Sequence, residues 1–279
     1  MTQWLIANEA GLKLAEVLGL LALLWLLQRR WPLRGDGNIA RRWRTNLSLI
    51  AISTLSLRLA LPTGAVAFAA WIQTSALGFL NQLSLGSALE ATAAVVLLDL
   101  AIYWQHRAFH RFPLLWRAHR VHHSDLGFDA SLGLRFHPFE ILPSMAFKLA
   151  VIAALGAAPI AVLVYELLLL GFSLLTHADL ALRPGWERAL RSVFVTPDWH
   201  RVHHSVLRAE TDSNYGNILS LWDRIFRTHV AQPRDGHAAM PIGLPEFRDA
   251  RSQTLVGLLC QPFRNGTPTS TSLLDNSHA

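Results

Sequence analysis

The sequence predicts an all-α protein whose apolar helices form a bundle in a membrane. Hydrophobic residues make up 52% of the 279 residues and charged residues only 16%, whereas a typical soluble domain has roughly 25% charged residues. The mean hydropathy is +0.29. Apolar stretches recur along the chain, and several approach the length of about 20 residues that a membrane-spanning helix needs. Clusters of histidine lie between and after these stretches.

Five stretches are expected to form the apolar helices, so the bundle has about four to five of them. The last two form a hairpin around Gly156–Pro159, which either crosses the membrane fully or only dips into it. Pro62 should kink the second stretch. The first stretch has no basic region before it and is expected to be an anchor and not a cleaved signal peptide. The five stretches are Gly11–Leu27, Leu47–Ile72, Ala88–Gln105, Ile141–Ala157 and Pro159–Thr176.

The positions of the positive charges predict the orientation of the bundle. The net charge is +6 and comes mostly from arginine. We expect the arginine-rich loop after the first stretch in the cytoplasm, since cytoplasmic loops carry an excess of Lys and Arg. The N-terminus is then outside, and the histidine clusters and the C-terminus are cytoplasmic. No nucleic-acid motif accompanies the charge. The arginines of that loop are Arg29, Arg30, Arg34, Arg41, Arg42 and Arg44.

The domain organisation is expected to be simple. Residues 1–263 should form one membrane-embedded domain, in which the more polar chain from His177 to about Phe263 is a cytoplasmic cap. Residues 264–279 are rich in Ser, Thr and Asn and are expected to be a disordered tail. The lone cysteine, Cys260, excludes a disulfide framework and a cysteine-built metal cluster. Any redox chemistry must therefore use nitrogen or oxygen ligands and receive its electrons from elsewhere.

Histidine spacing points to a metal site. The stretch from His106 to His123 contains His-x3-His followed by His-x2-His-His, and His119–Ser124 is repeated residue for residue at His200–Ser205. Such spacings place ring nitrogens on one side of a helical turn. Eight imidazoles exceed the needs of one metal, so a pair of metals is the economical interpretation. Imidazole binds iron, zinc, copper and nickel, and the ligand type alone does not choose among them.

These motifs resemble the sterol desaturase and fatty acid hydroxylase superfamily, which consists of membrane di-iron oxygenases. The family pattern is His-x3-His, then His-x2-His-His, then a second His-x2-His-His after a hydrophobic hairpin, and this chain matches all three. The resemblance covers roughly Asp99 to Thr228. It also includes Leu115–His119, Arg135–Glu140, Thr196–Trp199 and Asp212–Asn217.

The resemblance implies an oxidoreductase that activates O2 at two iron ions, for which zinc is a possible substitute. Its substrate would be a lipid from the bilayer (a sterol, fatty acyl chain, carotenoid or ether lipid), which it hydroxylates or desaturates. A separate protein would donate the electrons. The implied metal ligands are His106, His110, His119, His122, His123, His177, His200, His203 and His204.

Further residues are candidates for ligands or for partners of ligands, because metal-bound imidazoles usually donate their second N–H to a carboxylate or carbonyl. Asp99 lies in an apolar span on the same helical stripe as Tyr103, His106 and His110, and a carboxylate is costly there without such a role. His137 fits a ligand, a partner of one, or a helix cap beside Pro138. The full set is Asp99, His137, Glu140, Asp179, Asp198, Asp212 and Asn214.

Three other classes of protein compete with this interpretation. A bis-histidine haem electron carrier needs only a few histidines, and the chain has a surplus. A membrane metal-binding or transport protein would place polar residues near mid-membrane, whereas these clusters follow the ends of the apolar stretches. A zinc hydrolase with two metals also fits the ligand type.

Overall fold

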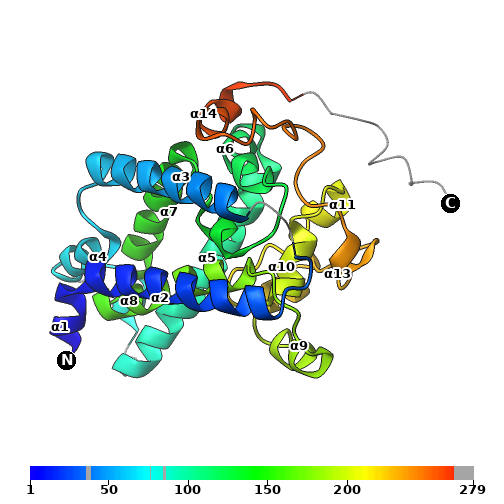
Figure 1. Cartoon of the computed structure of the whole chain (residues 1–279). Coiled ribbons are helices and arrows are strands. Elements are labelled where there is room, and N and C mark those ends of the chain that lie inside the picture. The colour runs from blue at the N-terminus through cyan, green and yellow to red at the C-terminus, as the bar shows by residue number, and fades with distance from the viewer. Residues whose placement is uncertain (36–38, 76, 84–85, 267–279) are drawn as a thin grey trace.

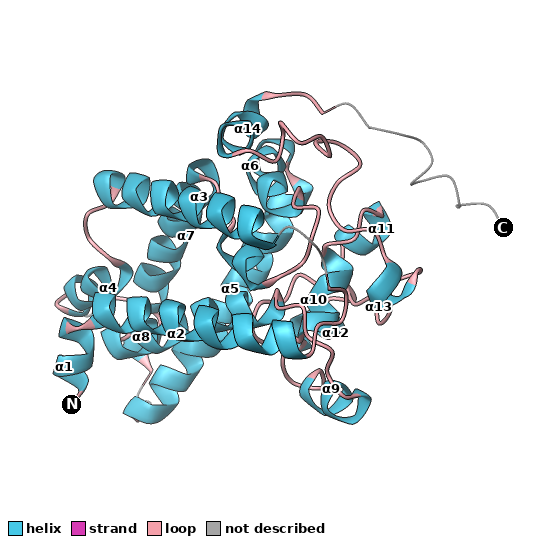
Figure 2. Ribbon diagram, viewed as in Figure 1, coloured by secondary structure: helices cyan, strands magenta, loops and turns pink. Residues whose placement is uncertain are grey.

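The computed structural model describes residues 1–35, 39–75, 77–83 and 86–266. In this part of the chain the regular structure is helical (Figure 2), with only two isolated β-bridges, Phe194 with Leu219 and Ser205 with Ile242. This confirms the all-α class. The predicted tail falls mainly on residues 267–279, which lie outside the described residues.

Among the residues that the structure describes, five helical segments are long and apolar enough to cross a membrane. Large apolar side chains on them point away from the protein, and Leu14, Leu18 and Leu55 are about 60% exposed. The chain is therefore a multi-pass membrane protein. The segments are α2 (Glu9–Arg30), α3 (Ile39–Ala60) continued by α4 (Ala65–Gln73), α5 (Ser87–Arg111), α7 (Pro138–Leu155) and α8 (Pro159–Thr176).

The second segment differs from the prediction at its start and at Pro62. It begins at Ile39, eight residues before the expected start, so three of the predicted loop arginines lie on α3. One of them, Arg42, forms ion pairs with Asp125 and Asp129 at 2.7 and 2.6 Å. No local pattern predicts these tertiary contacts. The expected kink at Pro62 is a full break between α3 and α4, since the residue before a proline disfavours helical geometry.

Helix α5 is longer than predicted and connects the membrane bundle to the histidines. It continues past Gln105 to Arg111, so His106 and His110 form its last turns. The predicted stripe of Asp99, Tyr103, His106 and His110 is confirmed, because all four side chains are buried along one face.

The predicted hairpin of α7 and α8 is present, and its second helix, α8, packs against α2, α4 and α5. Gly156 ends α7 with a φ of 68°, the left-handed conformation that glycine adopts without strain. Buried residues of α8, such as Val162 and Tyr165, join Leu98 of α5 and Ala69 of α4 in the largest apolar core. The hairpin therefore fixes α5, and with it the first histidines, relative to the rest of the bundle.

Short helices form a polar cap at one end of the bundle, where α10, α11 and α13 gather (Figure 1). Buried Arg135 pairs with Asp125 after α6 and donates hydrogen bonds to Asn46 of α3 and to Gln253 in the C-terminal part of the chain. The remaining elements are α1 (Thr2–Ala7), η1 (Leu80–Gln82), α6 (Pro113–His123), η2 (Ala130–Leu134), α9 (Pro184–Leu190), α10 (Pro197–His203), α11 (Arg208–Thr211), α12 (Leu221–Ile225), α13 (Gly236–Ala239), α14 (Leu255–Cys260) and η3 (Gln261–Phe263).

Candidate metal centre

Nine buried histidines meet in two adjacent groups, and they are the nine expected as ligands. Each residue of a group offers a nitrogen within 4.8 Å of the others. The last turns of α5, helix α6, the residue after α8, and α10 with the residue that follows it supply the rings. Group one is His106, His110, His119, His123 and His203, and group two is His122, His177, His200 and His204.

The two copies of the repeated motif share both groups reciprocally. The first copy gives His119 and His123 to group one and His122 to group two, while the second copy gives His200 and His204 to group two and His203 to group one. Residues four apart lie on the same face of a helix. The histidine just before the second of them, His122 or His203, is turned about 100° around the helix axis. Neither copy therefore forms a site alone.

Hydrogen bonds fix which nitrogen is bare in two rings of group one, His106 and His119. Nδ1 of His119 lies 2.7 Å from Oε1 of Glu140, and Nδ1 of His106 lies 2.8 Å from the carbonyl oxygen of Tyr215. An oxygen acceptor requires the proton on Nδ1, so Nε2 of each neutral ring carries only a lone pair. These two Nε2 atoms are nevertheless 3.2 Å apart. Two lone pairs repel at that distance unless a cation lies between them.

In group two, a hydrogen bond leaves Nε2 of His177 bare in the same way. Nδ1 of His177 donates to the carbonyl oxygen of Ser173 over 2.6 Å, which leaves its Nε2 bare. That Nε2 lies 3.1 Å from the Nε2 atoms of His122, His200 and His204. The nitrogens converge as ligands of one ion do, so the donor set fits a metal in each group.

Carboxylates and carbonyls outside the groups orient the rings. Besides Glu140, Asp212 accepts a hydrogen bond from Nδ1 of His110 over 3.1 Å. The carbonyl oxygen of Ser213 accepts from Nδ1 of His203 over 2.7 Å. Nε2 of His110 and Nε2 of His203 are buried without a partner, as expected of atoms that face a metal position.

Burial favours the neutral form of five of the rings. It lowers the pKa of His177 to about 4 and that of His203 to about 3, although a hydrogen bond to a carbonyl oxygen opposes the change in both. Burial and the neighbouring histidines together lower the pKa of His122, His123 and His204 well below the usual value. Neutral imidazole is the form that binds metals.

Four of the other candidates lie elsewhere. Asp99 accepts hydrogen bonds from Nε1 of Trp222 (2.8 Å) and the backbone N–H of Leu219, not from a histidine. Asp179 accepts from the backbone N–H of Gly35, and Asp198 pairs with Arg201. Asn214 donates to backbone carbonyls of Trp199 and Val230. All four hold loops and helices of the cap in place.

His137 adopts the capping role. Its Nδ1 accepts a hydrogen bond from the backbone N–H of Phe139 at the start of α7, and its Nε2 donates to the carbonyl oxygen of Leu259. Both nitrogens are occupied, so the ring has none left for a metal.

Sequence reasoning missed Asp223, which organises the loop beside group one. Its buried carboxylate accepts from Nε1 of Trp199 and from the backbone N–H groups of Tyr215 and Gly216. Tyr215 is the residue whose carbonyl oxygen holds His106. Asp223 lies outside the histidine motifs, and no pattern in the sequence marked it.

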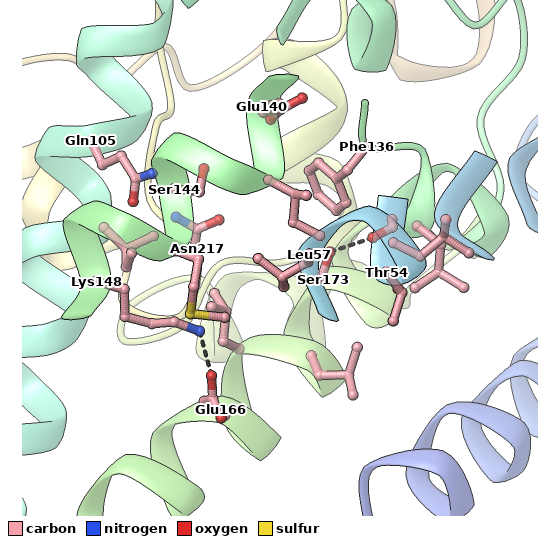
Figure 3. Close-up of a pocket in the computed structure, with 18 of the residues that line it drawn as sticks. Thr54, Leu57, Gln105, Phe136, Glu140, Ser144, Lys148, Glu166, Ser173 and Asn217 are labelled. Carbon is pink, nitrogen blue, oxygen red and sulfur yellow. Dashed lines mark hydrogen bonds and ion pairs between the residues drawn. The ribbon is translucent and has the colours of Figure 1, made fainter. Parts of the chain in front are cut away.

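A cavity of about 380 Å³ leads from the histidines into the membrane bundle. Rings of both groups line one end of it, and α3, α5, α7 and α8 form most of its wall. Figure 3 shows its other part, where Lys148 pairs with Glu166, which also binds Lys13 at 2.6 Å. The wall between is mainly apolar, with residues such as Leu57, Met145 and Leu169. Its shape and lining suit a lipid chain.

Residues 91–228 match the family model described as fatty acid hydroxylase. This range contains all nine histidines and the hairpin between them. The chain belongs to the sterol desaturase and fatty acid hydroxylase superfamily. Membership agrees with the resemblance noted in the sequence and with the paired nitrogen groups.

Named relatives of the superfamily act on lipids. Ornithine lipid hydroxylase OlsE of Rhizobium tropici is 34% identical over 53% of this chain and 44% of its own length. The alkylglycerol monooxygenases of Homo sapiens and Danio rerio are each 33% identical over 48% of this chain and 29% of their own length. The match therefore spans less than half of each relative. No solved structure matches the chain.

Proposed function

We propose that this protein is an O2-dependent oxygenase that uses two iron ions, one in each histidine group, to oxidise a C–H bond of a membrane lipid. One observation carries the proposal: two sets of bare, converging nitrogens lie at the end of an apolar cavity inside a membrane bundle. The activities for which the relatives are named, hydroxylase and monooxygenase, favour hydroxylation over desaturation.

The chain supplies the positioning for this chemistry. The bound irons would supply the reduction of O2 and the attack on a C–H bond, which side chains alone cannot perform. The apolar wall holds the lipid chain and keeps water from the reacting carbon. Glu140 and Asp212 hold the rings of His119 and His110 in the orientation that directs Nε2 inward. A separate donor protein delivers electrons at the polar cap, which we place on the cytoplasmic side.

The arrangement of the rings does not favour a haem carrier. A porphyrin would have to fit between Nε2 atoms that are 3.1 to 3.3 Å apart in both groups. A hydrolase with two zinc ions fits the same nitrogens, so metal content and the requirement for O2 distinguish it from the proposed oxygenase.

Metal content and oxygen incorporation test the proposal together. Protein purified in mild detergent should contain about two irons per chain, one for each nitrogen group. Cells that express it under 18O2 should accumulate a lipid with one added 18O atom, and cells with His122→Ala should not. His237→Gln is the control, because this histidine belongs to neither group. Full activity of metal-free protein, or product formation without O2, would contradict the proposal.

A further inference from the structure

Three polar side chains interrupt the apolar wall of the cavity close to group one. Gln105 comes from α5, Ser144 from α7 and Asn217 from the loop after Tyr215, and all three line the cavity. Figure 3 shows all three in the same part of the cavity.

These three side chains have hydrogen-bond donors and acceptors that can bind a ligand. Nδ2 of Asn217 is buried and has no partner. Within the described residues, Gln105 and Ser144 also make no side-chain hydrogen bond. A buried amide N–H without a partner costs about 1 to 3 kcal/mol, so a ligand that accepts its hydrogen bond binds with an advantage. By contrast, the hydroxyl of Ser173 in the same wall already donates to the carbonyl oxygen of Gly133.

Each of the three residues is close in sequence to a residue that forms or orients group one. Gln105 precedes His106, and Asn217 follows Tyr215, which accepts the His106 hydrogen bond, by two residues. Ser144 lies one helical turn, roughly 5.4 Å, after Glu140, the partner of His119. A polar group held by them would therefore lie in the cavity that His106 and His119 of group one also line.

The chemistry of the three side chains indicates an uncharged ligand group. Two amides and a hydroxyl offer both donors and acceptors and no net charge. The nearest cation along α7, Lys148, already pairs with Glu166. Hydroxyl, ester and amide groups of lipids match this set.

We propose that Gln105, Ser144 and Asn217 form a subsite that binds an uncharged polar group of the lipid, so that the oxidised carbon lies near that group and not near the end of the hydrocarbon tail. This inference rests on the proposed function and assigns its substrate class: a neutral polar lipid or the neutral linkage region of a larger one.

Binding of three matched probes tests the subsite without turnover. The probes are 1-O-hexadecylglycerol, hexadecane and palmitate, and native mass spectrometry of the iron-loaded protein gives their relative affinities. Wild-type protein should bind the glycerol ether most tightly. Gln105→Leu and Asn217→Leu should each weaken that binding about three- to tenfold, the value of one hydrogen bond, and leave hexadecane binding unchanged.

Controls separate a local effect from damage to the fold. Ser144→Ala is a mild change in a helix and should give a loss in the same range. Thr54→Val removes a hydroxyl from the α3 wall of the same cavity and should leave the preference for the ether intact. Metal content should stay at the wild-type level in every variant.

The outcomes are distinct. Equal binding of the ether and hexadecane, tighter binding of palmitate, or no effect of the three substitutions would overturn the subsite. If the preference and its losses appear but no lipid ever gains oxygen from O2, the proposed function fails and the subsite stands.

Discussion

The reciprocal sharing of histidines predicts that equivalent substitutions in the two repeated motifs have unequal effects. His122 and His203 occupy the same place in the two copies, but His122 belongs to group two with four nitrogens and His203 to group one with five. His122→Ala leaves three nitrogens, whereas His203→Ala leaves four, enough for a complete tetrahedral site. We therefore expect His122→Ala to weaken metal binding more.

The size of the difference follows from the ligand count. A four-ligand structural zinc site provides about 10 to 16 kcal/mol, or about 2.5 to 4 kcal/mol per ligand if shared equally. Loss of one ligand from group two should then lower the affinity of that group for its metal roughly a hundredfold to a thousandfold. For group one, whose remaining four nitrogens still form a full set, we expect about a tenfold loss or less.

Metal analysis during chelator titration measures both values. Wild type should retain two metals, His122→Ala should lose one at low chelator concentration, and His203→Ala should lose one only at higher concentration. His237→Gln should behave as wild type, and size-exclusion profiles should show that each variant remains folded. If both alanine variants lose both metals together, the two groups act as a single site and the partition is refuted.

Three further predictions concern residues around the groups. Glu140→Leu should lower metal affinity about 10- to 100-fold, because it removes the acceptor of His119, and Glu140→Gln, which keeps an acceptor, should lose less in the same chelator assay. Gly133→Ala should lower the thermal unfolding temperature in detergent and release the group two metal. The reason is that the new Cβ would lie 2.3 Å from the carbonyl oxygen of Ser173, which holds His177. A variant that melts and binds metal like wild type would count against this packing. Asp125→Asn should destabilise the fold by about 3 to 5 kcal/mol, because fully buried Arg135 loses the carboxylate that it pairs with, although Arg42 keeps Asp129. Burial alone would raise the pKa of Asp125, but Arg42 and Arg135 outweigh it and hold the pKa below its usual range. The stabilisation by Asp125 should therefore be complete above about pH 4 and decrease as the pH falls further. Identical melting of wild type and variant at pH 7 would exclude this ion pair as a stabilising contact.

Much of the fold could be predicted, because hydrophobic length and histidine spacing are local signals. The hairpin at Gly156 and the stripe on α5 are set by residues close in sequence, and both are confirmed. The start of α3 was wrong because ion pairs of Arg42 with residues more than 80 positions away stabilise that end. Such contacts leave no trace in a short stretch of sequence.

The site shows the same limit. Spacing indicated which histidines carry the chemistry, but it did not divide them between two groups, because that division depends on how α6 and α10 face each other. The carbonyl oxygens of Ser173, Ser213 and Tyr215 hold three of the rings. Every residue has a carbonyl group, so residue type cannot mark these partners. For Asp99, the cost of burial in an apolar span correctly indicated a buried partner, which is Trp222 and not a histidine.

The division of the histidines also sets the order in which the sites can be assembled during synthesis. Once His123 has been made, group one has four of its five nitrogens, whereas group two has only His122 and waits for His177, His200 and His204. At about 5 to 20 residues per second, the ribosome needs several seconds to bridge that interval. Four of the five nitrogens of group one are thus synthesised before the α7–α8 hairpin, while group two exists only when the hairpin has been inserted and α10 has folded back. If the proposed function holds, the two metal positions would gain most of their ligands at different stages of synthesis.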